Sequence, residues 1–140
     1  MATPRWLATV SQEPLVRTPI AIGLGAIAGA LSRYYLGLWI GGRLGPAFPY
    51  GTFIINLTGC LGMGFFTTLT EQTIISPDVK SLIAVGFLGS YTTFSTYELD
   101  SRNLVREGEF GAATFYWAAS AILGFVGLQI GVVLARLLTR

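Results

Sequence analysis

Residues 110–135, FGAATFYWAASAILGFVGLQIGVVLA, contain no Asp, Glu, Lys or Arg. Residues 44–70 form a second run that lacks these charged residues. A helix of about 20 apolar residues, rising about 1.5 Å per residue, spans the roughly 30 Å hydrocarbon core of a bilayer. Both runs are therefore long enough to cross a membrane as helices.

Two weaker segments complete the predicted fold. Residues 18–42 are apolar apart from Arg33, and residues 81–97 form a shorter uncharged run that ends at Glu98. In this shorter run, glycines and a Ser–Thr cluster stand where a lipid-facing helix would carry leucine, which predicts a break. Backbone groups freed by a break cannot face lipid, so they must line water, bind an ion or pack against protein.

We therefore predict an all-α integral membrane protein with four transmembrane helices, the third of them broken mid-membrane. A lead-in at residues 1–18, interfacial or disordered, should precede the transmembrane domain at 19–140. The predicted helices cover about 19–42, 49–70, 79–107, with a break near 89–93, and 110–138.

Composition excludes several classes of protein. Of the 140 residues 52% are hydrophobic and only 11% charged, against about a quarter charged in average soluble domains. One cysteine, Cys60, and no histidine leave no internal disulfide, no ordinary transition-metal site and no nucleophile–base pair, so we do not expect an enzyme. The net charge of +2 is spread along the chain, which argues against binding nucleic acid.

The basic residues in the loops are nearly balanced between the two sides of the predicted membrane. A surplus of Lys and Arg in short loops normally fixes orientation, so a balanced chain can insert both ways. Two opposite copies can then pair as an antiparallel, two-fold homodimer. One side carries Arg5, Arg17, Lys80, Arg136 and Arg140, and the other carries Arg43, Arg102 and Arg106.

Three stretches resemble one family: GAIAGALSRYY (25–35), PYGTFIINLTGCLGMG (49–64) and GFLGSYTTFSTYE (86–98). Together with Tyr116 and Ser120 on one face of the last helix, they make the chain resemble the CrcB/Fluc fluoride channels from about residue 20 to the C-terminus. The resemblance implies a fluoride-selective passive anion channel in the cell (inner or plasma) membrane. Such a channel exports fluoride from the cytoplasm and gives fluoride resistance.

The resemblance also implies an assembly: an antiparallel dual-topology homodimer with two pores and a structural Na⁺ on the two-fold axis, with no organic cofactor. Gly89 and Thr92 match the positions whose backbone carbonyls hold that sodium. The alternative for Gly89 is a mere kink, because glycine adopts backbone angles closed to other residues.

Two polar residues match roles in the anion pathway. Arg33 matches an arginine that attracts anions in a vestibule, although it could instead reach the membrane interface or neutralise Glu98 or Asp100. Asn56 matches an asparagine whose amide donates to fluoride, and the alternative is a structural bond between helices.

Aromatic and hydroxyl residues complete the implied pathway. Phe94 matches a phenylalanine that presents its ring edge, the positive part of the quadrupole, to the ion. Tyr97 stands where the family usually has a second phenylalanine, and our hypothesis is that it keeps conduction while altering the rate. Tyr116 and Ser120 match a hydroxyl track that Ser95 or Thr96 could join.

Two other functions are compatible with four apolar helices. A small multidrug-type transporter needs a carboxylate deep in a span for proton exchange, but no acidic residue lies between Thr18 and Thr70, and Glu98 and Asp100 come after the predicted break. A non-conducting scaffold subunit would use its polar residues only for helix association and would show no ion selectivity.

Overall fold

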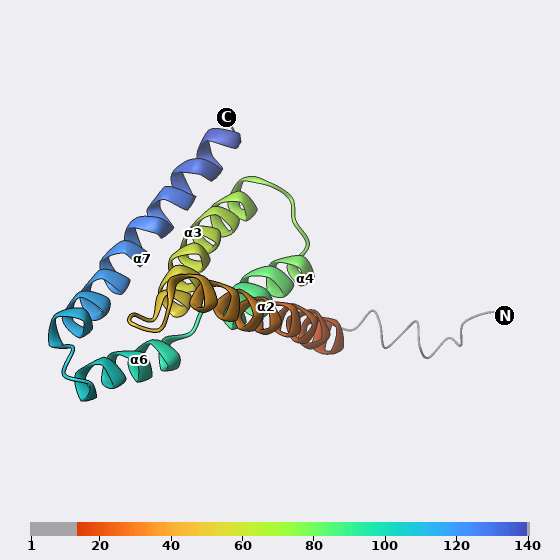
Figure 1. Ribbon diagram of the computed structural model, residues 1–140. Helices are drawn as coiled ribbons and strands as arrows, with labels where there is room; N and C mark the ends of the chain where they lie inside the picture. Colours follow the sequence, from red (N-terminus) through yellow and green to blue (C-terminus); the bar gives the residue numbers. More distant parts are fainter. Residues whose placement is uncertain (1–13, 140) are drawn as a thin grey trace.

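The computed structural model describes residues 14–139, in which helices are joined by short connections and no strand is present (Figure 1). Helices α3 and α7 pack along each other, and α2 packs against η1 and α5. The elements are α2 (Pro14–Leu44), α3 (Tyr50–Gln72), α4 (Pro77–Lys80), η1 (Ser81–Leu88), α5 (Gly89–Tyr91), α6 (Phe94–Arg106) and α7 (Phe110–Leu138).

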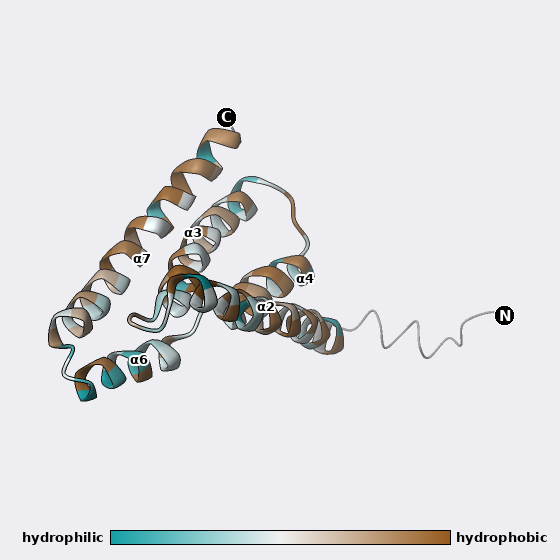
Figure 2. Ribbon diagram, in the orientation of Figure 1, coloured by the Kyte–Doolittle hydropathy of each residue, from teal (hydrophilic) through white to brown (hydrophobic). Residues whose placement is uncertain are grey.

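Three helices are long and apolar enough to cross a membrane: Val16–Leu44, Tyr50–Gln72 and Phe110–Leu138. Hydrophobic residues cover much of their length, whereas α6 carries more polar residues (Figure 2). Large apolar side chains on their surfaces, such as Leu24 and Phe125, are more than half exposed. In water this surface would cause aggregation, whereas in lipid it faces its natural solvent. The chain is a multi-pass membrane protein.

Glycines set how closely α2 approaches η1. A Cβ atom on Gly25 would overlap the carbonyl oxygen of Leu82, and one on Gly29 would overlap that of Phe87. On η1, a Cβ on Gly86 would lie 3.0 Å from the Cα atom of Gly25. Because small residues four apart let helix backbones meet in lipid, Gly25 and Gly29 are the packing positions of α2 against η1.

Glycines also allow the close approach of α3 to α7. A Cβ on Gly64 of α3 would overlap the carbonyl oxygen of Leu128, and one on Gly131 of α7 would overlap that of Leu61. These contacts fix the relative translation of the two helices, since each glycine admits a backbone atom of its neighbour. They thereby determine which polar side chains of α3 and α7 meet.

The predicted break in the third segment is confirmed. The segment starts as α4, continues through the π-helical η1 and ends at Tyr91 of α5. Thr92 (φ −82°, ψ 156°) and Thr93 (φ −149°, ψ 118°) are extended, and α6 begins at Phe94. The chain thus leaves and re-enters helical geometry within the Ser–Thr cluster.

The start of α2 differs from the prediction. The helix begins at Pro14, five residues before the predicted start at about residue 19, and includes Pro19. A proline within a helix removes one hydrogen bond, and here contacts with α4 hold the adjacent turn. Arg17 forms an ion pair with Asp78 at 2.8 Å, and the Thr18 hydroxyl donates to the same carboxylate at 3.2 Å.

The remaining boundaries lie near the expected ones: α3 starts one residue later and ends two residues later than 49–70, and α7 has the bounds 110–138. The predicted lead-in at 1–18 is partly helical from Pro14 onward, and its first 13 residues lie outside the described part of the chain.

Candidate functional site at the break in the third segment

Asn56 of α3 joins the break to the rest of the bundle. Its Nδ2 donates to the carbonyl oxygen of Thr93 at 3.1 Å, and the N–H of Thr93 donates to its Oδ1 at 2.8 Å. The structural alternative for Asn56, a bond between helices, is therefore part of the arrangement. An amide nitrogen carries two donors, so one N–H of Asn56 remains for another acceptor.

Thr93 also caps the N-terminal end of α6. Its Oγ1 accepts the N–H of Thr96 at 3.3 Å and donates to the Thr96 hydroxyl oxygen at 3.0 Å. A side-chain oxygen at this position satisfies one of the N–H groups that a helix start leaves without a partner. Of the two hydroxyls that could join the track, Thr96 is thus engaged with Thr93, whereas Ser95 is exposed.

These bonds change the partners of two backbone carbonyls. In a continuous helix, the carbonyl of Gly89 would accept the N–H of Thr93, and that of Thr92 would accept the N–H of Thr96. Both N–H groups are instead directed to side chains, of Asn56 and Thr93 respectively. The carbonyl oxygens of Gly89 and Thr92, the two residues that the resemblance connects with sodium, thus lack the N–H partners that a continuous helix would give them.

Arg33 of α2 reaches the same break from the other side. Its Nε donates to the carbonyl oxygen of Ser90, in α5, at 3.0 Å. A guanidinium suits this position because the last carbonyls of a helix lack internal partners and carry partial negative charge. Pairing of Arg33 with Glu98 or Asp100 is absent from the described residues, where the ion pair that forms is Arg17–Asp78.

A small cavity of about 160 Å³ opens beside the break between α3, α6 and α7. Four of its lining residues belong to the predicted pathway, and Ala121 is the fifth. The pathway residues there are Asn56, Phe94, Tyr97 and Ser120.

Ser120 distinguishes this cavity from ordinary helix packing. Its Oγ atom is buried, and among the described residues it has no hydrogen-bond partner. A buried hydroxyl without a partner costs about 1–3 kcal/mol, so such a group calls for a ligand, a water or a functional reason. With the second N–H of Asn56 it gives the cavity two neutral donors, which suits a small anion.

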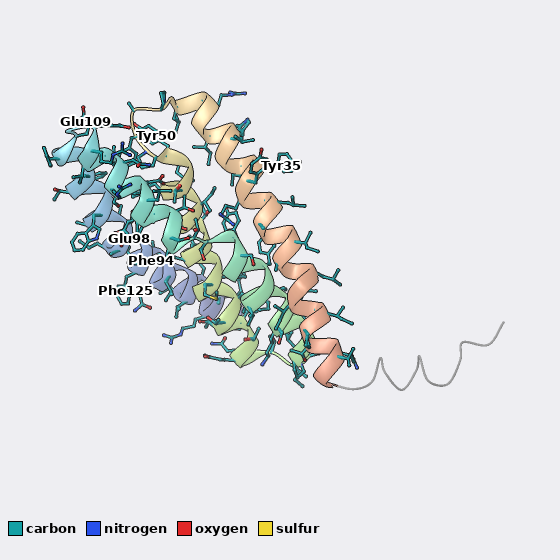
Figure 3. The ribbon with its side chains drawn as sticks, turned by 90° about the horizontal axis from the view of Figure 1, so that it is seen from below. Tyr35, Tyr50, Phe94, Glu98, Glu109 and Phe125 are labelled. Carbon is teal, nitrogen blue, oxygen red and sulfur yellow. The ribbon has the colours of Figure 1, made fainter. Side chains whose placement is uncertain are left out.

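Two aromatic residues enclose the cavity in different ways. Phe94 is 74% exposed, whereas Tyr97 is 7% exposed, and their ring centroids lie 5.5 Å apart. Figure 3 shows Phe94 and Glu98 on one side of the molecule and Tyr35 on the other. The Tyr97 hydroxyl donates to the Trp117 carbonyl of α7 at 2.8 Å.

Tyr116 is fully buried and packs against Tyr97, with ring centroids 5.3 Å apart. Its hydroxyl donates to the Asp100 carboxylate at 3.2 Å, and Tyr116 is not among the residues that line the small cavity. The sequence did not assign this role to Asp100, and nothing in the spacing of the two residues indicated the contact.

Comparison with known proteins gives the family. The family model described as "CrcB-like protein, Camphor Resistance (CrcB)" matches residues 20–132. A protein of Trichormus variabilis called "Fluoride-specific ion channel FluC" is 59% identical over 128 residues, which cover 90% of this chain and 93% of the relative. Proteins of the same name from Synechococcus sp. (strain JA-2-3B'a(2-13)) and Acidobacterium capsulatum are 54% and 43% identical, covering 89% and 82% of this chain and 97% and 93% of the relatives.

The fold and the site define a small helical membrane protein with a polar break at its centre. With these matches, the chain belongs to the CrcB family.

Proposed function

We propose that this protein is a fluoride-selective passive anion channel that lets fluoride leave the cytoplasm. The observation that carries the proposal is the Ser120 hydroxyl, which is buried, has no hydrogen-bond partner among the described residues and lies beside a small cavity that Asn56 also lines. Support comes from relatives called "Fluoride-specific ion channel FluC", of which the chain covers up to 97%. Hydrogen fluoride enters cells as a neutral molecule and ionises inside, so the trapped ion can leave without an energy source.

Neutral donors suit conduction better than fixed charge. An ion must bind well enough to enter the pathway and weakly enough to leave it, and several weak sites achieve both. The Ser120 hydroxyl, the free N–H of Asn56 and the ring edge of Phe94 can each replace part of the hydration shell of fluoride. Arg33 lies outside this cavity, where it can attract anions without trapping them.

The working form is an antiparallel, dual-topology homodimer with two pores. Phe94 is 74% exposed although it lines the cavity, so one wall of the pathway is open in a single chain and a second copy can complete it. The near balance of basic residues between the two sides supports insertion in both orientations. The segment η1–α6 is the fourth crossing, and the membrane is the cell membrane.

The backbone carbonyls of Gly89 and Thr92 from each copy would hold a structural Na⁺ at the two-fold axis. The fit rests on the chemistry of the donors: a hard cation takes oxygen ligands, and these two carbonyls have lost their helical partners at the break. When bound, the cation would supply positive charge that offsets the partial negative charge of these carbonyl oxygens. Arg33 does the same for Ser90.

Fluoride efflux from liposomes that hold the purified protein tests the function, with a fluoride electrode as the detector and matched chloride-loaded liposomes as the control. We expect rapid release of fluoride and negligible release of chloride. Equal release of both ions would refute selectivity. No release from well-folded protein would refute the channel and leave a scaffold subunit or a transporter as the function to be tested.

A further inference from the structure

Tyr97 forms part of the boundary between two cavities. The small cavity beside Asn56 and a second one of about 390 Å³, which continues along α6 and α7 toward Glu98 and Trp117, have Phe94, Tyr97 and Ala121 in common. A residue shared by two neighbouring cavities stands between them. An ion that moves from one cavity to the other must therefore pass these three side chains.

The three shared residues differ in how firmly they are held. Ala121 carries only a methyl group, and Phe94 is 74% exposed. Tyr97 is 7% exposed, packs on the ring of Tyr116 and donates its hydroxyl to the Trp117 carbonyl at 2.8 Å. The fixed part of the boundary is therefore the ring of Tyr97.

The hydroxyl of Tyr97 has one proton, and that proton is committed to α7. A phenol donates a single hydrogen bond, so Tyr97 cannot donate to an anion while it donates to Trp117. A carbonyl oxygen has two lone pairs, so Trp117 can accept this bond in addition to the helical bond of α7. The tie between α6 and α7 thus costs α7 no helical bond.

We propose that the Tyr97 hydroxyl is a tether that holds the boundary between the two cavities closed and thereby limits the rate of ion passage. Tyr97 is in this sense a positioning residue and not an ion ligand. The inference rests on the proposed fluoride conduction. Without the hydrogen bond to Trp117, the ring of residue 97 still packs on Tyr116 but moves aside more readily.

The test compares initial fluoride efflux from liposomes over a series of internal fluoride concentrations for the wild type and Tyr97→Phe. Removing one neutral hydrogen bond should raise the maximal rate roughly two- to twelvefold. The half-saturating fluoride concentration should stay unchanged, since the donors Asn56 and Ser120 are untouched. Protein with 4-aminophenylalanine at position 97, which keeps a donor, should return to the wild-type rate.

Tyr34→Phe is the matched control, because Tyr34 is 60% exposed on α2 and should leave both parameters unchanged. A half-saturating concentration that rises in Tyr97→Phe would overturn the proposal and make the hydroxyl an ion ligand. An unchanged or lower maximal rate would overturn it by showing that the tether does not limit passage. Absence of fluoride release from the wild type would instead refute the proposed function, and with it the proposal that Tyr97 limits the rate of ion passage.

Discussion

Ser120→Ala separates a functional hydroxyl from a structural one. The substitution removes an oxygen that is buried and has no hydrogen-bond partner among the described residues. An unpaired buried polar group costs about 1–3 kcal/mol, so its loss should leave stability unchanged or slightly raise it. A hydrogen bond to a charged group contributes about 1.5–3 kcal/mol, so loss of this donor should slow fluoride passage at least about tenfold.

Ser101→Ala is the matched control, because Ser101 is also buried but its hydroxyl has a partner. Its Oγ donates to the carbonyl oxygen of Tyr97 at 2.9 Å, so the change should cost about 0.5–1.5 kcal/mol of stability. It should leave the rate of fluoride efflux near that of the wild type. Ser120→Ala should thus lower the efflux rate without lowering stability, whereas Ser101→Ala should lower stability without lowering the efflux rate.

The assays are initial fluoride efflux from liposomes and the midpoint of thermal unfolding in detergent, measured on the same preparations. The reasoning predicts slow efflux with an unchanged or higher midpoint for Ser120→Ala, and normal efflux with a lower midpoint for Ser101→Ala. Normal efflux from Ser120→Ala would refute a role for this hydroxyl in the pathway. Slow efflux together with a lower midpoint would indicate that Ser120 supports the fold.

Three other substitutions test the parts around the cavity. Asn56→Ala should lower stability by about 2–4 kcal/mol, because it removes both hydrogen bonds to Thr93 and leaves the backbone amide of Thr93 without a partner. Efflux should fall too. An unchanged unfolding midpoint would contradict the geometry. Arg33→Lys should cost about 1–2 kcal/mol in the same unfolding assay, since an ammonium cannot reproduce the Nε bond, and full stability would show that the bond is dispensable. Gly25→Leu should abolish a monodisperse peak in size-exclusion chromatography because it forces α2 away from η1, whereas Gly23→Leu, where a Cβ meets nothing within 4 Å, should not.

The long helices and the break could be predicted because their signals are local. The long uncharged runs predicted α3 and α7, since a bilayer tolerates few charged side chains and a chain that crosses it must form its backbone hydrogen bonds internally. The Ser–Thr cluster with Gly89 indicated the break, and Thr92 and Thr93 are extended. The predicted start of α2 at about residue 19 was wrong, because Arg17 and Thr18 are held in the helix by contacts with Asp78, which is 60 or more positions away in the sequence.

The contacts of the site could not be predicted from spacing. Which residue of α3 meets Thr93 depends on how far one helix is shifted along another, and glycine contacts such as that of Gly64 with Leu128 set that shift. A change of one residue in that shift would bring a different side chain than Asn56 to the break. The bond of Tyr116 to Asp100 depends on the same shift, together with the side-chain conformations of both residues.

The hydrogen bonds of Asn56 and Thr93 connect the proposed cation site at the break with the proposed anion cavity. The N–H of Thr93 turns to Asn56, and the N–H of Thr96 turns to the Thr93 hydroxyl. The carbonyl oxygens of Gly89 and Thr92, the proposed cation ligands, thereby lose the N–H partners of a continuous helix, while Asn56 keeps a donor for an anion. A break built in this way separates acceptors from donors without placing a fixed charge in the cavity, and loss of Asn56 should therefore disturb both proposed ion sites at once.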